Sequence, residues 1–177
     1  MTTSIISTHS LTKQFDSKTA LNDFTLSINT GGIHAIIGAN GAGKSTLFRI
    51  LLGLEAPTYG ESFILGMNSQ ALTPEMRGRI GYVNEEHTLP TWMTAEEVTN
   101  MQRNLYPKWR QDIYDNVIGN FDVQPTQKIS MLSRGERAGL NLSMALAQAP
   151  EVLILDEPTL GLDVVAKQAF LEALMYS

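Results

Sequence analysis

The sequence predicts an α/β fold with a helical insertion, and three observations lead to this prediction. Strand-like segments and one helix occupy the first part of the chain, an entirely apolar run follows at Val152–Leu155, and the stretch between carries only helical signals. With 177 residues, the chain suffices for one domain with a core but is short for two. We expect a single domain over 1–177, with its core at 1–87 and 150–177 and a helical subdomain at about 88–149.

Five segments before residue 88 have the composition of strands. They are Ile5–Thr8, Phe24–Ile28, Ile33–Ile37, Glu61–Leu65 and Ile80–Val83. The run Val152–Leu155 is apolar at every position, which is typical of a strand buried on both faces of a parallel sheet.

Helices are predicted where capping residues and helical spacing coincide. Thr94 and Glu97 form a capping-box pattern for a helix that ends near Tyr106, before Pro107. An amphipathic helix is predicted by apolar residues at every fourth position, namely Trp109, Ile113, Val117 and Phe121. Further helices are expected at 47–54, about 136–149 and about 164–176.

Composition limits the classes of partner. The net charge is −5, whereas nucleic-acid binders usually carry a basic excess. The chain has no cysteine, which excludes disulfides and thiolate metal sites. Its start lacks the pattern of a signal peptide, and no stretch approaches the ~20 apolar residues that span a bilayer. We expect a cytoplasmic protein that binds no nucleic acid and reaches a membrane only through a partner.

The stretch GANGAGKS, Gly38–Ser45, matches the phosphate-loop pattern G-x-x-x-x-G-K-[ST] at every position. Its glycines let successive N–H groups turn toward phosphate oxygens, and the helix that follows adds its positive N-terminal dipole. Lys44 suits the β- and γ-phosphates, and Ser45 suits Mg²⁺. The alternative is a chance glycine-rich turn, but the preceding apolar segment and the following helix supply the context that this motif needs.

Two carboxylates, Asp156 and Glu157, directly follow the apolar run Val152–Leu155. Ligands of open α/β sheets bind at this edge. Asp156 suits Mg²⁺ through a water molecule, and Glu157 suits a general base that orients water toward a γ-phosphate. The simpler alternative is a strand ending in a polar, solvated turn, which the phosphate loop in the same chain disfavours.

The stretch SRGERAGL, Ser133–Leu140, gathers charged residues at a predicted helix start. Ser133 and Glu136 form a capping-box pattern, and this local explanation is complete in itself.

Taken together, these motifs resemble those of the ATP-binding subunit of an ABC transporter, over almost the whole chain and in the family's order. GANGAGKST resembles the Walker A loop and VLILDE the Walker B strand; LSRGE, Leu132–Glu136, resembles the ABC signature and LGLD, Leu160–Asp163, the D-loop. The signature is the discriminating motif, because many unrelated ATPases carry Walker motifs. The resemblance implies a P-loop NTPase (RecA-like) core with an N-terminal antiparallel β-subdomain and an inserted α-helical subdomain.

The resemblance also implies ATP and Mg²⁺ as cofactors and assigns roles to residues. Glu157 is the implied catalytic residue, and Mg²⁺ is assigned to Ser45 and Asp156, with Glu85 as a third candidate. In the family, two subunits close head to tail on two ATP molecules. The signature residues that would contact ATP in trans are Ser133, Arg134, Gly135 and Glu136, and Asp163 belongs to the D-loop. ATP contacts in the same subunit are implied for Phe15, Gly38, Asn40, Gly41, Ala42, Gly43, Lys44, Ser45 and Thr46.

Three of these positions need comment. Arg134 stands where the family often has glycine, and arginine there either adds charge toward the phosphate or pairs across the dimer. Phe15 stands where an aromatic ring stacks on adenine, although a core phenylalanine is the alternative. Glu85 stands where the family has the Q-loop glutamine, and Glu86 beside it leaves the register open by one.

The family's switch histidine normally lies beyond the last residue of this sequence, and His9, His34 and His87 all precede Walker B. We therefore expect a C-terminally truncated domain that binds Mg-ATP and hydrolyses it poorly.

The resemblance implies a motor subunit, peripheral at the inner face of the membrane. It would form a homo- or heterodimer with a second ATPase subunit and pair with a separate integral-membrane permease. LSRGERAGL and YPKW (Tyr106–Trp109) look most like bacterial exporter ATPases. One alternative is a non-transport ABC-type ATPase acting on nucleic acid or ribosomes. Another is a regulatory module without turnover, against which the intact Lys44, Asp156 and Glu157 argue.

Overall fold

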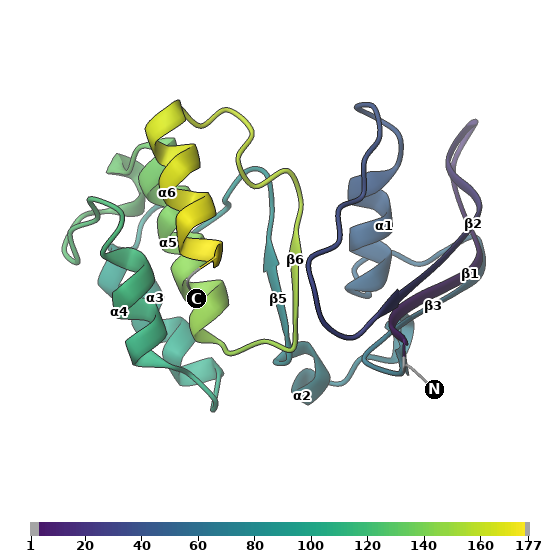
Figure 1. The fold of residues 1–177 in the computed structure, drawn as a ribbon, viewed down its shortest axis with the longest axis horizontal. Helices are drawn as coiled ribbons and strands as arrows, with labels where there is room; N and C mark the ends of the chain where they lie inside the picture. The colour runs from purple at the N-terminus through teal and green to yellow at the C-terminus, as the bar shows by residue number, and fades with distance from the viewer. Residues whose placement is uncertain (1–3, 176–177) are drawn as a thin grey trace. The chain divides into compact units, whose positions relative to one another are not determined.

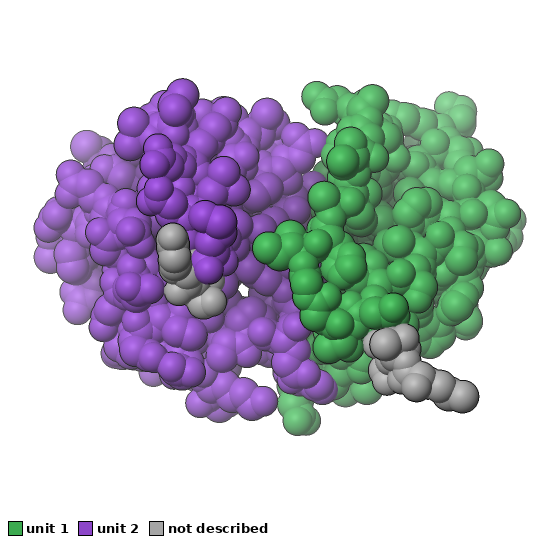
Figure 2. All heavy atoms as spheres, viewed as in Figure 1, with its two compact units in different colours: residues 1–77 green, residues 78–177 purple. Residues whose placement is uncertain are grey.

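The computed structural model describes residues 4–175, and the chain divides into two compact units, residues 1–77 and 78–177 (Figure 2). The first unit contains β1 (Ser4–Phe15), β2 (Lys18–Asn29), α1 (Lys44–Leu51), β3 (Tyr59–Ile64), β4 (Met67–Asn68), η1 (Ser69–Ala71) and α2 (Pro74–Arg77). The second contains β5 (Ile80–Val83), α3 (Ala95–Leu105), α4 (Gln111–Ile118), η2 (Ile129–Met131), α5 (Arg134–Ala147), β6 (Val152–Leu155) and α6 (Val164–Met175) (Figure 1).

The first unit is an antiparallel sheet with the strand order β2-β1-β3-β4. β1 is its centre: it pairs with β2 from Ser4↔Asn29 to Phe15↔Lys18 and with β3 on its other side. α1 contacts β2 and β3, so the apolar face of the helix is buried there. The antiparallel β-subdomain implied by the resemblance is confirmed.

The predicted strand Ile33–Ile37 is wrong, because this segment has no regular structure. A strand needs a neighbour for its backbone N–H and C=O groups. Among residues 4–175, no strand pairs with this segment. Ile33 and Ile37 are each 93% exposed, so apolar composition alone does not make a strand here.

The second unit contains the parallel pair β5–β6, with Ile80 opposite Val152 and Val83 opposite Leu155. Both strands and the parallel arrangement are as predicted. The predicted burial on both faces is not reached, because only Ile154 of β6 is buried and the other three side chains are half-buried. The hydrogen bond from the Asp156 N–H to the Val83 carbonyl, 2.9 Å, continues the pairing one residue beyond β6.

Helix α5 forms the centre of the second unit and contacts α3, α4, α6 and β5. Its buried positions include several small residues, and at Gly139 the ring of Phe121 comes so close that an added Cβ would lie 2.1 Å from the ring Cγ. The predicted capping box at the start of α3 is confirmed, because Thr94 and Glu97 exchange both hydrogen bonds.

Helix α4 is shorter than its apolar stripe. It begins at Gln111, so Trp109 and Phe121 lie outside it, yet the stripe residues still pack inward. The Arg110 N–H donates to the Ala147 carbonyl (2.7 Å), and this bond fixes the extended chain before the helix against the end of α5. The last predicted helix is α6, and Tyr176 lies outside the described residues.

Over residues 4–175, none of the helices combines the length and the apolar character that crossing a bilayer requires.

Candidate nucleotide site

The phosphate loop leads directly into α1. Gly43 is the N-cap, in left-handed conformation at φ 90°, and the first turn of α1 carries no acidic side chain. The Lys44 ammonium donates to the carbonyls of Gly38 (2.8 Å) and Ala39 (3.2 Å), so the lysine folds back across the loop. A helix N-terminus together with a cation over the loop is an anion site. Gly38, Asn40, Gly41, Ala42 and Ser45 are exposed, and Thr46 is half-buried.

At Gly43 the loop packs closely against strand β2 of the antiparallel sheet. A Cβ at this position would lie 2.3 Å from the Ala20 carbonyl oxygen and 3.0 Å from Leu21, both on β2. Its φ also favours glycine. Leu21 in turn pairs with Lys13 on β1, two residues before Phe15. The phosphate loop and the β1–β2 hairpin that carries Phe15 are therefore packed together within the first unit.

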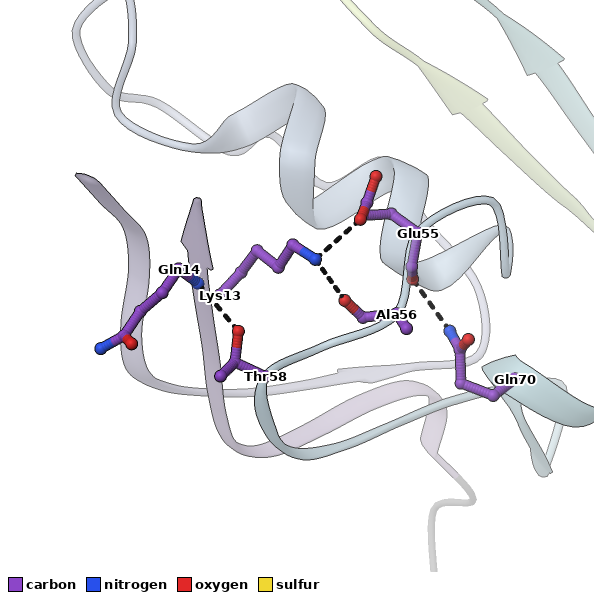
Figure 3. Close-up of polar contacts among 6 residues, drawn as sticks. All are labelled: Lys13, Gln14, Glu55, Ala56, Thr58 and Gln70. Carbon is purple, nitrogen blue, oxygen red and sulfur yellow. Dashed lines mark hydrogen bonds and ion pairs between the residues drawn. The ribbon is translucent and has the colours of Figure 1, made fainter. Parts of the chain in front are cut away.

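Phe15 lies at the end of β1 and is 43% exposed. This exposure excludes the alternative of a core phenylalanine, and an exposed aromatic side chain is a surface on which another ring can stack. Lys13 lies beside Phe15 and was not predicted from the sequence as part of the site. Its ammonium contacts Glu55 and Ala56 in the loop after α1 (Figure 3). A lysine in a strand carries no sequence signal for such a contact.

Asp156 follows β6 and is 5% exposed. Its Oδ1 has no hydrogen-bond partner among the described residues, which is costly for a buried carboxylate. Among residues 4–175, no three acidic or histidine side chains gather into a metal cluster. Mg²⁺ commonly uses one or two protein oxygens together with substrate phosphates and water. The open carboxylate oxygen of Asp156 therefore fits Mg²⁺ that arrives with a nucleotide.

Glu157 is held in an unusual backbone conformation, with φ 46°, and its side chain is half-buried. Its carbonyl accepts from the Leu160 N–H (3.0 Å), which closes the turn that follows Walker B. Left-handed backbone at a non-glycine residue is strained and tends to occur at functional sites.

The signature residues form a well-capped start of α5. The Glu136 N–H donates to the Ser133 Oγ at 3.2 Å, and the Ser133 N–H donates to the Glu136 carboxylate at 2.6 Å. The predicted capping box is confirmed. The Ser133 oxygen is used as an acceptor, and its hydroxyl hydrogen remains for a further acceptor. Gly135 lies against α6, because an added Cβ would be 2.9 Å from the Ala166 Cβ.

Arg134 contacts two other motifs of its own unit. Its Nη2 donates to the Glu85 carbonyl at 3.4 Å. Its guanidinium also lies on the backbone of Gly161, where an added Cβ would be 2.8 Å from Nη1. The start of α5 is thereby brought together with the Q-loop position and the D-loop. Neither role considered for Arg134 in the sequence analysis included this contact within the chain.

Asp163 caps α6. Its Oδ1 accepts from the Ala166 N–H at 2.8 Å, and the side chain is exposed.

His87 lies in the turn after Glu85, fully buried, with φ 47°. Neither ring nitrogen reaches hydrogen-bonding geometry with a described residue. Burial lowers the pKa of His87 from its ordinary 6.5, and the charges of Arg134 and Arg137 lower the pKa further, while the nearby Pro158 backbone opposes the decrease. His87 therefore lies near Pro158, which follows Walker B, and near Arg134 and Arg137 at the start of α5.

The lowered pKa predicts a pH effect on stability. Unfolded His87 takes up a proton below about pH 6.5, whereas the folded protein resists it until a lower pH, so the free energy of unfolding should fall as pH decreases from 6.5. The carboxylates whose pKa is lowered, Glu55, Asp112 and Glu151, titrate in a more acidic range. Thermal unfolding at pH 7.5 and 5.5 should show a smaller loss in His87→Gln than in the natural protein. His34→Gln is the control and should lose as much stability between these pH values as the natural protein. An equal loss of stability in His87→Gln and the natural protein would contradict the role given to His87.

The glycine-rich loop before α1, the antiparallel sheet and the parallel pair ending in two carboxylates define a P-loop NTPase fold. Comparison with known proteins then identifies the family: the profile described as "ABC transporter" matches residues 21–160. The chain belongs to the ABC transporter family and contains its ATP-binding domain.

Relatives of this chain include transport ATP-binding proteins and a translational throttle protein. The bacitracin transport ATP-binding protein BcrA of Bacillus licheniformis is 34% identical over 163 residues, which cover 91% of this chain and 53% of the relative. The energy-dependent translational throttle protein EttA of Haemophilus influenzae is 36% identical over 97% of this chain and 30% of its own length. The chain thus spans about half or less of these two relatives.

A solved structure described as the ATP-binding subunit of an ABC transporter has a TM-score of 0.82 and 27% identity, covering 96% of this chain and 73% of that one. The fold implied by the resemblance is confirmed.

Proposed function

We propose that this chain is the ATP-binding and ATP-hydrolysing motor part of an ABC transporter. The observation that carries the proposal is the phosphate loop before α1, with Lys44 folded over it, in a chain that also has the capped signature helix α5. The loop supplies a phosphate site, and the signature supplies the feature that separates this family from other P-loop ATPases.

The residues of the phosphate loop bind the nucleotide in this proposal. N–H groups of Gly41, Gly43, Lys44 and Ser45 hold the phosphates, and Lys44 exchanges its carbonyl contacts for phosphate oxygens. Asn40, Ala42 and Thr46 complete the loop, and Phe15 stacks on adenine. Ser45 and Asp156 hold Mg²⁺, which neutralises charge on the phosphates, with Glu85 as a further candidate ligand.

Glu157 is the proposed general base. It accepts a proton from the water that attacks the γ-phosphorus. The bond from this phosphorus to the bridging oxygen breaks, ADP is the leaving group, and inorganic phosphate is the other product. The turn closed by the Leu160 N–H fixes the backbone of Glu157 and so limits where its carboxylate reaches.

The second half of each ATP site comes from a partner subunit in this proposal. Ser133 donates its hydroxyl hydrogen, and Gly135 and Glu136 present the positive N-terminus of α5 to the γ-phosphate held by the other subunit. Arg134 holds Gly161 of the D-loop beside this surface, and Asp163 of the same loop is proposed to face the partner subunit. We propose that the dimer is coupled to a separate membrane permease and is peripheral to the membrane. Residues 88–149 form the helical subdomain in this proposal.

Glu157→Gln tests the proposal. The variant should bind Mg-ATP as tightly as the natural protein but hydrolyse it at least about 100-fold more slowly, because glutamine takes no proton at neutral pH. Persisting ATP should also shift the variant toward dimers in sedimentation velocity with Mg-ATP and not with Mg-ADP. Glu172→Gln, at an exposed position on α6, is the matched control. Hydrolysis at the natural rate by Glu157→Gln would contradict the assigned base.

A second candidate is supported by one comparison, the 36% identity to the translational throttle protein EttA. In that case the ATPase cycle would act on a ribosome instead of a permease. The net charge of −5 argues against extensive contact with RNA. Fractionation of cells that express a tagged full-length protein separates the two, since a permease subunit retains it with membranes and a ribosome retains it in polysome fractions.

A further inference from the structure

Lys13 makes polar and aromatic contacts from a largely buried position. It lies on β1, and its side chain is only 13% exposed. The ammonium forms an ion pair with Glu55 at 2.7 Å and donates to the Ala56 carbonyl at 2.8 Å, as Figure 3 shows. Both partners lie in the loop after α1, the helix that begins at the phosphate loop. Lys13 therefore joins the strand that carries Phe15 to the far end of that helix.

The same ammonium lies over the ring of Phe15, 4.7 Å from the ring centroid. A cation at this distance from an aromatic face is attracted by the ring's π-electrons. One face of Phe15 is thereby covered, while the side chain as a whole is 43% exposed. The ring thus has a cation over one face, while much of the side chain stays open to solvent.

Neighbouring backbone contacts hold this arrangement in place. The Gln14 N–H donates to the Thr58 hydroxyl at 3.0 Å, and the Thr58 N–H donates to the Thr12 carbonyl at 2.8 Å. These bonds, the first of which Figure 3 also shows, tie β1 to the segment that follows Ala56 on both sides of Lys13. The lysine is consequently limited in the directions it can take, and so is the ring beneath it.

We propose that Lys13 is a positioning residue for the nucleotide base: it holds the Phe15 ring from behind so that adenine stacks on the open face. This inference rests on the proposed function and adds a residue to the same site. Lys13 acts on the base through Phe15 and does not touch the phosphates. Its loss should therefore weaken binding of ligands that have a base and leave binding of the bare triphosphate unchanged.

A merely structural role makes a different prediction. If the ion pair with Glu55 only stabilises the fold, a substitution of Lys13 weakens ATP and tripolyphosphate to the same extent, because both ligands need the same folded protein. The ratio of the two dissociation constants is independent of the folded fraction, so it stays informative even if the variant is less stable.

The experiment compares the dissociation constants of Mg-ATP and Mg-tripolyphosphate by titration calorimetry. Lys13→Met keeps most of the length of the side chain and removes the charge. It should weaken binding of Mg-ATP about two- to fivefold and leave binding of Mg-tripolyphosphate unchanged. Lys13→Arg should retain the natural ratio, since arginine also stacks on aromatic faces. Lys108→Met, at an exposed position between α3 and α4, is the matched control and should change neither constant.

A double substitution completes the test. In a Phe15→Leu background, Lys13→Met should cause no further loss of Mg-ATP affinity, because the ring through which it acts is gone. The proposal would be overturned if Lys13→Met left the ratio of the two dissociation constants unchanged, for example by weakening both ligands equally. It would also be overturned if Lys13→Met caused its full loss of Mg-ATP affinity in the Phe15→Leu background. Binding of neither ligand by the natural protein would contradict the proposed function, and the role of Lys13 with it.

Discussion

Lys44→Ala is expected to weaken binding of Mg-ATP by at least about 100-fold. The Lys44 ammonium is the only charged side chain of the loop Gly38–Thr46, and charge-assisted bonds to phosphate are among the strongest in proteins. With Mg-ATP at 100 times its dissociation constant, the natural protein gains about 2.7 kcal/mol of stability, whereas a variant with 100-fold weaker binding gains about 0.4 kcal/mol. The measurement is the shift of the unfolding midpoint on adding Mg-ATP.

Lys167→Ala controls for the loss of a lysine, since Lys167 is exposed on α6. This variant should keep the full shift. The assignment of the phosphate loop is contradicted if Lys44→Ala keeps a shift as large as that of the natural protein.

Gly139→Ala should destabilise the protein by about 2 kcal/mol, although alanine is the better helix former. The helix propensity favours the substitution by about 1 kcal/mol. However, the new methyl group would lie 2.1–2.5 Å from three ring atoms of Phe121, and overpacking of this kind costs about 3 kcal/mol or more in a buried position. For a chain of this length, the unfolding midpoint should fall by about 4–8 °C.

Gly119→Ala is the matched control. Gly119 ends α4 in right-handed backbone conformation, and an added Cβ would be no closer than 3.2 Å to the Asp115 carbonyl. This substitution should change the free energy of unfolding by less than about 0.5 kcal/mol. In addition, Phe121→Leu combined with Gly139→Ala should cost less than the sum of the two single changes. Additive losses would show that the ring contact is not the cause.

The local parts of the site were predictable from sequence because they depend on neighbouring residues. The phosphate loop is defined by eight consecutive positions, and the capping boxes at Thr94 and Ser133 depend on a pair three residues apart. The strand before the acidic pair could be recognised from its unbroken apolar run, which also predicted a parallel sheet, whereas its pairing with β5 comes from the structure.

Contacts between distant segments could not be predicted in this way. Lys13 meets Glu55 across 42 residues, and Arg134 meets the Glu85 carbonyl across 49, and neither pair has a distinctive spacing. The segment Ile33–Ile37 illustrates the converse, because its composition suits a strand while the pairing that makes a strand depends on another segment. Register and tertiary partners therefore had to come from the structure.

The central claim is that this chain binds Mg-ATP through the loop Gly38–Thr46, and titration calorimetry with the natural protein tests it most directly. We predict saturable binding of one Mg-ATP per chain, weakened when EDTA removes Mg²⁺. The absence of binding heat at several temperatures, in a sample whose circular dichroism and cooperative unfolding show that it is folded, would contradict the claim.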